Sequence, residues 1–190
     1  MKGLIEANLH YLQQAAALVD ALEDGSYVRA EPMFYNSTVG GHLRHCLDHY
    51  ESFARGVSEG KIDYDCRCRD QQVENKTHVA RSRINTIIGL LERLADQTPN
   101  KSVLIKMDCG GASQRGQDNA NNCAGGAGEL WQSSTLGREL QFLVSHTVHH
   151  FAMIRGICQR AGESLDADFG MAPSTLRYRE QLGNNKPTAD

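Results

Sequence analysis

The chain has 190 residues, of which 40% are hydrophobic and 23% charged, and its formal net charge is −3. This length and composition predict one globular domain over residues 1–190. The negative charge argues against sequence-independent binding of nucleic acid, which needs a basic surface. No apolar run is long enough for a membrane span, and the N-terminus lacks the features of a signal peptide. We therefore expect a cytoplasmic protein that binds neither nucleic acid nor membrane.

Four segments have the apolar period of an amphipathic helix. The first predicted helix spans about residues 3–24. The second spans about 38–57, with Ser37 placed as its N-cap. The third spans about 76–96, and the fourth, which is the longest, spans about 135–161.

The connections between these helices are informative as well. The segment between the second and third helices, 58–75, is long enough to cross the length of a bundle. Between the third and fourth helices, SVLIKM and ELWQSS predict a small β-hairpin. The stretch 108–128 between them is rich in Gly, Asn and Ala, and we expect a mobile loop there. The tail from about 163 is expected to pack along the helices.

Six cysteines could form disulfides, bind zinc or stay free. None forms a C-x-x-C pair, and the closest spacing is that of Cys66 and Cys68. Cys46 and Cys158 lie inside predicted helices, where a reduced thiol behaves as a small hydrophobic group. Because no secretory signal is visible, we expect free thiols.

The histidines are the strongest candidates for chemistry. Six of the eight lie in two windows, GGHLRHCLDHY in the second predicted helix and SHTVHHFAMIRG in the fourth. His146 and His150 are four residues apart and therefore share one helix face, whereas His149 points away from it. This pair could bind a metal ion, or it could simply pack in or near a core.

The second window supplies His42, His45 and His49, which share one stripe of the second helix. If the second and fourth helices pack antiparallel, His45 meets His146 and His150 near mid-height. Three imidazoles from two facing helices would hold a metal and leave coordination positions open for water or substrate. The clustering on two elements at one height favours the metal over packing.

Other polar residues near these windows have weaker signals. His42 and His49 are expected to cap, to hydrogen-bond or to line a cavity. Glu139 and Asp48 could each support a ligand from behind, although a solvated surface role is the commoner one for such carboxylates.

Two arginine-rich stretches could frame an anionic substrate. They are CRCRD, with Arg67 and Arg69, and LRYRE, with Arg177 and Arg179. Structural ion pairs are the more frequent use of such arginines.

Four longer motifs carry a family resemblance: TVGGHLRHCLDHY, YDCRCRD, GRELQFLVSHTVHHFAMIR and FGMAPSTLRYRE. With them the chain resembles an uncharacterised branch of the DinB superfamily of metal-binding four-helix bundles, over most of its length except 108–128. The resemblance implies an all-α, up-down-down-up bundle that holds a divalent metal, commonly nickel or zinc. By position in the motifs, its ligands are His45, His146 and His150.

The resemblance also implies a function. Characterised relatives include transferases that use low-molecular-weight thiols, so we expect a metal-dependent transferase or hydrolase with a small-molecule substrate, in which the metal lowers the pKa of a thiol or water. It further implies a homodimer, and it assigns no catalytic side chain. The alternative is a non-catalytic bundle that binds metal or a small ligand for sensing or storage. An enzyme needs a pocket beside the metal.

Overall fold

The computed structural model describes residues 1–107 and 130–184, and this part of the chain is mostly helical with a small three-stranded sheet. Its four long helices are α1 (Lys2–Ala21), α3 (Val39–Glu59), α5 (Thr77–Glu92) and α6 (Leu136–Ala161). They confirm the four predicted helices, with ends that differ by a few residues. The predicted mobile loop at 108–128 lies outside the described residues.

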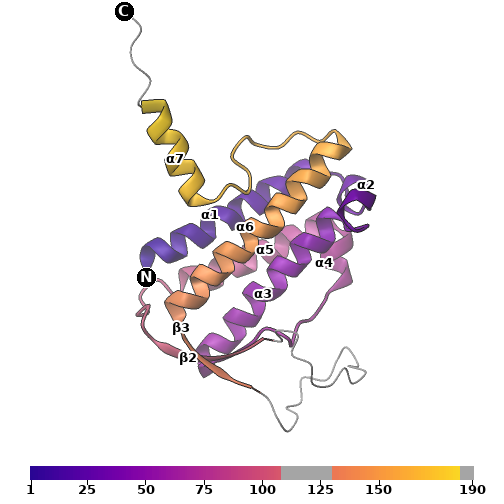
Figure 1. Ribbon diagram of the computed structural model, residues 1–190. Helices are drawn as coiled ribbons and strands as arrows, with labels where there is room; N and C mark the ends of the chain where they lie inside the picture. The colour runs from indigo at the N-terminus through magenta and orange to yellow at the C-terminus, as the bar shows by residue number, and fades with distance from the viewer. Residues whose placement is uncertain (108–129, 185–190) are drawn as a thin grey trace, which may run out of the picture.

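The long helices pack in pairs around one apolar core. Both α1 and α3 contact α5 and α6 (Figure 1). Helices α3 and α6 run in opposite directions, as the contacts of His42 with His150 and of His49 with His146 require. Apolar side chains from all four helices are fully buried between them, among them Leu12, Phe53, Ile84, Leu140 and Ile154. Burial of such a side chain contributes about 1.5–3 kcal/mol.

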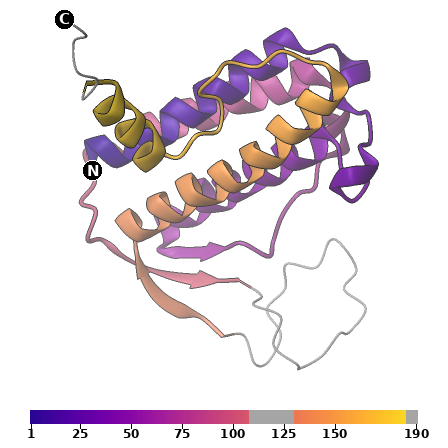
Figure 2. The same cartoon turned by 45° about the horizontal axis from the view of Figure 1, so that its top comes forward.

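The sheet lies at one end of the helices (Figure 2). Its order is β1 (Lys61–Asp63), β2 (Ser102–Lys106) and β3 (Gln132–Thr135). Strands β2 and β3 are antiparallel, which confirms the hairpin predicted from SVLIKM and ELWQSS. Strand β1 pairs parallel to β2 and was not predicted, because three residues are too few to show an alternating pattern.

Gly56 explains how β1 can lie directly on α3. A Cβ at this position would overlap the carbonyl oxygen of Lys61 and the Cα of Ile62. The missing side chain thus permits a close approach between helix and strand, and it brings the chain that follows β1 alongside the histidine face of α3.

The start of α3 differs from the prediction. Thr38, not Ser37, is the N-cap: its backbone is extended and its hydroxyl accepts a hydrogen bond from the Gly41 N–H at 2.8 Å. The hydroxyl of Ser37 instead donates to the carbonyl oxygen of Phe34. The residues before it, Tyr35 and Asn36, have φ values of 57° and 55°, and this left-handed turn directs Ser37 away from the cap position.

The remaining helices are short or peripheral. They are α2 (Asp24–Tyr27), the 3-10 turn η1 (Pro32–Phe34), α4 (Gln71–Asn75) and α7 (Pro173–Asn184). The tail packs as predicted only in part: Phe169 is buried and stacks on Phe151, whereas Tyr178 on α7 is 60% exposed. No described helix is both long and apolar enough to cross a membrane.

The thiol prediction needs one correction. Cys46, Cys68 and Cys158 are free, as expected, but Cys66 is disulfide-bonded. None of those three is its partner. Sequence spacing could not reveal this bond, because the pairing depends on which segments the fold brings beside the crossover.

Candidate metal centre

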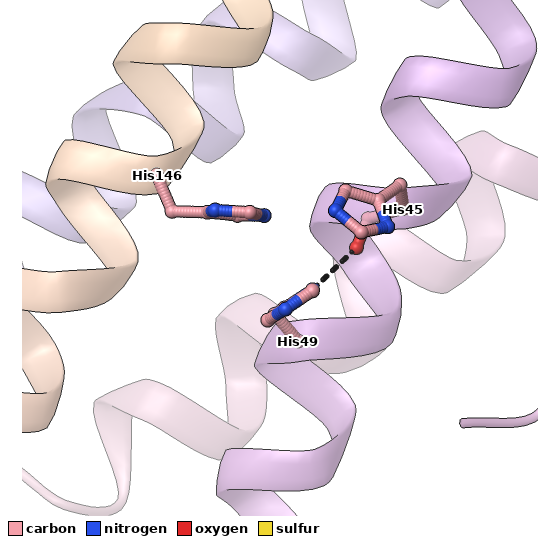
Figure 3. A group of neighbouring side chains, drawn as sticks. All are labelled: His45, His49 and His146. Atoms are coloured by element: carbon pink, nitrogen blue, oxygen red, sulfur yellow. Dashed lines mark hydrogen bonds between the residues drawn. The ribbon is translucent and has the colours of Figure 1, made fainter. Parts of the chain in front are cut away.

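Five histidines from α3 and α6 gather between the two helices: His42, His45, His49, His146 and His150. His45 and His49 lie on successive turns of α3, and Figure 3 shows both facing His146 on α6. The ligand atoms that these three side chains offer all lie within 4.8 Å of one another. His150 is next to them, with its ring centroid 4.6 Å from the rings of both His45 and His146.

This group contains two of the three predicted ligands, His45 and His146, and its third member is His49 instead of His150. Each helix offers a pair four residues apart, and only the rotation of the helices about their axes decides which members of the pairs meet. His150 lies beside this group, in ring contact with His45 and His146, but its ligand atoms are not part of it. His149 is exposed, as its position on the helix predicted.

Hydrogen bonds assign the tautomers of His45, His49 and His150. Nδ1 of His45 accepts from Arg67 at 3.2 Å, which places the His45 proton on Nε2. The Nδ1–H of His49 donates to the carbonyl oxygen of His45 at 2.9 Å, which leaves the lone pair on Nε2 of His49. That nitrogen is therefore free to coordinate a metal.

A longer chain of hydrogen bonds acts on His150 in the same way. Because the Ser37 hydroxyl donates to Phe34, it accepts from Nε2–H of His42 at 2.9 Å. Nδ1 of His42 then accepts from Nδ1–H of His150, also at 2.9 Å. The lone pair of His150 is left on Nε2. His42, which was expected to hydrogen-bond or line a cavity, thus orients His150.

His146 has an unusual environment. Its Nε2 is buried and has no hydrogen-bond partner among residues 1–107 and 130–184. A buried polar atom without a partner costs about 1–3 kcal/mol, so it calls for an explanation. A metal ion bonded to Nε2 would satisfy this atom, and the neighbouring imidazoles are ligands that nickel and zinc accept.

The cluster is neutral at physiological pH. Burial, followed by the charges of neighbouring histidines, lowers the pKa of His45 to about 2, of His146 to about 3 and of His150 to about 4. Burial also lowers the pKa of His42 and His49. Neutral imidazole is the form that coordinates metals.

Tyr64 connects the cluster to Glu139. The Tyr64 ring stacks on His49 with centroids 5.6 Å apart, and its hydroxyl donates to Glu139 at 2.9 Å. Ser134 donates to the same carboxylate. Glu139 is buried and has no hydrogen bond to a histidine among the described residues, so it can support His49 only through the tyrosine ring. Tyr64 was not predicted as part of the site, because its only signal in the sequence is its place in YDCRCRD.

A pocket of about 360 Å³ opens beside the cluster. Its lining includes His42, His45 and His150, together with Arg44 and Glu74. Arg44 forms two ion pairs that fix it in the pocket lining. Its Nε is 2.8 Å from Glu74, and its Nη1 is 2.7 Å from Asp48.

The structure corrects the surface role expected of two carboxylates. Asp48 is 4% exposed and accepts from Arg44, one turn earlier on α3. Glu139 is 2% exposed and accepts from Tyr64, which is distant in the sequence. Of the arginines in LRYRE, Arg179 makes an exposed ion pair with Asp168, which is the structural use considered above.

Comparisons with known proteins add little about this site. No family model matches the chain. FK506-binding protein 5 of Rhizopus delemar is 29% identical over 117 residues, which make up 62% of this chain. The chain spans only 27% of the length of that protein, so most of the protein that carries this name has no counterpart here. The likeness does not assign a family.

Proposed function

We propose that this protein is a divalent-metal-dependent enzyme with its metal held between α3 and α6. The buried, unpartnered Nε2 of His146, facing other neutral imidazoles, is the observation that carries the proposal. The DinB-like motifs support it independently. In this proposal the four long helices form the up-down-down-up bundle that the resemblance implies.

His146 is the central ligand in this arrangement, and His49 and His150 supply the others. His45, whose Nδ1 accepts from Arg67 and whose proton is therefore on Nε2, joins them when this proton leaves Nε2 for Nδ1 and the hydrogen bond to Arg67 is given up. The tautomers of His49 and His150 leave Nε2 free on both, which favours including His49 beside the three ligands implied by the resemblance. Ser37 and His42 orient His150 from behind. Nickel and zinc are the metals proposed, because both accept imidazole nitrogen.

The pocket favours catalysis over storage. Its volume of about 360 Å³ falls within the range of small-molecule sites, and three of the clustered histidines line it. A divalent metal at this place would lower the pKa of a bound thiol or water. We therefore propose a thiol-dependent transferase or a hydrolase that acts on a small molecule. The family resemblance also supports a homodimer, and we propose a cytoplasmic location from the sequence pattern.

The alternative is a bundle that stores or senses the metal without catalysis. The burial of Nε2 of His146 favours it, because non-catalytic metal sites are closed whereas catalytic ones keep an open coordination position. A storage protein would not turn over small thiols or esters. The enzyme would turn over its substrate at a rate proportional to the amount of bound metal.

The first experiment is calorimetric titration of the metal-free protein with zinc and with nickel. We expect one ion per chain, and His146→Gln should weaken binding by about 10- to 100-fold, as loss of one of the ligands or their support typically does. The matched control is His149→Gln on the same helix, whose exposed side chain should leave the affinity unchanged. Equal affinities in the two variants would refute the site.

A further inference from the structure

Arg67 is a partly buried cation that lies against the histidine cluster. Its Nη1–H donates to Nδ1 of His45 at 3.2 Å. Its Nε is buried and has no hydrogen-bond partner among the described residues. No ion pair between described residues includes Arg67. The carboxylates of Asp48 and Asp65 stabilise its positive charge through space, but neither makes an ion pair with it.

Two other half-buried arginines are paired with carboxylates, and a third, Arg155, donates to backbone carbonyl oxygens. Arg44 binds the carboxylates of Asp48 and Glu74, and Arg83 binds those of Glu51 and Asp70. Buried charges are normally paired in this way, because an unpaired charge loses its hydration without compensation. The Nε–H of Arg67 is therefore left to donate to an anion.

The backbone holds Arg67 in this place. The carboxylate of Asp63 accepts hydrogen bonds from the N–H groups of Asp65 and Cys66, at 2.9 and 3.1 Å. The carbonyl oxygen of Cys66 accepts from Arg55 on α3 at 2.7 Å. These hydrogen bonds fix the segment to α3 next to the histidines, so the backbone itself positions Arg67 beside His45.

A metal in the cluster makes the charge of Arg67 harder to accommodate. A metal on Nε2 of His45 would place the imidazole proton on Nδ1, which could then no longer accept from Arg67. The two positive groups would also repel each other, and the low local dielectric strengthens that repulsion. An anion between them removes it. The planar guanidinium fork matches the paired oxygens of a carboxylate or phosphate.

We propose that the ligand of this site carries an oxyanion, a carboxylate or phosphate group, and that Arg67 binds it beside the metal. This inference rests on the proposed function and names its substrate class. The pocket beside His45 admits a small molecule, and Ser37 and Thr38 add polar lining. Arg67 does not line this pocket, and it is next to it through its contact with His45.

The test uses the full chain loaded with cobalt(II), whose visible absorption reports changes at the metal. Sodium acetate and inorganic phosphate are the two probes, and the one that binds more tightly identifies the source of the oxyanion. We expect a saturable spectral change for wild type. Arg67→Gln should weaken anion binding by about 10- to 100-fold, the range for loss of a charge-assisted hydrogen-bonded pair. Arg67→Lys, which keeps the charge and loses the fork, should show an intermediate loss.

Arg69→Gln is the matched control, because it removes the same charge from an exposed neighbour. It should bind the anions within about twofold of wild type. Cobalt binding without any spectral response to either anion would overturn this inference and leave the metal site standing. So would equal anion affinity in wild type and Arg67→Gln. Failure of cobalt to bind at all would overturn both the inference and the proposed function.

Discussion

Acidification of the metal-free protein should destabilise it through the clustered histidines. An unfolded histidine has a pKa near 6.5, whereas burial lowers the pKa of His45, His146 and His150 to about 2, 3 and 4. Between these values the unfolded state binds protons that the folded state does not. Stability therefore falls as the pH drops below about 6.5, and it is nearly constant above about 7.

The magnitude follows from proton linkage. From about pH 7 to pH 5, each such histidine changes the free energy of unfolding by up to about 1.9 kcal/mol. Because the imidazoles are partly open to solvent, about 1–2 kcal/mol each is the expected range. The three histidines together give about 3–6 kcal/mol, a large share of the 5–15 kcal/mol typical of a domain. His42 and His49 act in the same direction.

The assay is urea unfolding followed by circular dichroism, in the presence of a chelator, at several pH values between about 7.5 and 5. His146→Gln should reduce the change in the free energy of unfolding between pH 7 and 5 by about 1–2 kcal/mol, the contribution of one histidine. His149→Gln, at an exposed position, should leave this change as in wild type. Constant stability across this range, or an undiminished slope in His146→Gln, would refute the assignment of buried neutral imidazoles.

Two further substitutions test the surroundings of the site. Gly56→Ala should destabilise the protein by about 1–3 kcal/mol or more in urea unfolding, because its Cβ overlaps the backbone of Lys61, while Gly25→Ala has open space around it and should not. Tyr64→Phe removes a hydrogen bond from buried Glu139 and should cost about 1–3 kcal/mol without changing metal stoichiometry; an unchanged stability would show that this carboxylate does not depend on it.

The helices and the histidine windows could be predicted from sequence because both are local patterns. Apolar stripes define α1, α3, α5 and α6, and two H-x-x-x-H pairs are visible in the sequence. The position of α3's N-cap was wrong by one residue, because the decisive feature is the left-handed turn at Tyr35 and Asn36, which no propensity favours strongly.

The details of the site depend on tertiary packing and could not be read in this way. The presence of His49 in the group is set by how α3 and α6 rotate about their axes. Asp48 and Glu139 look like surface carboxylates until Arg44 and Tyr64 are seen beside them. The contact of Arg67 with His45 depends on how the crossover folds back onto α3.

The central claim is that one metal ion binds between α3 and α6. Anomalous diffraction at the zinc edge, from crystals grown with zinc, tests it most directly. We expect one peak about 2.0–2.1 Å from Nε2 of His146, with at least two of His45, His49 and His150 at the same distance. A peak elsewhere on the chain with none between these helices, at full zinc occupancy, would contradict the account.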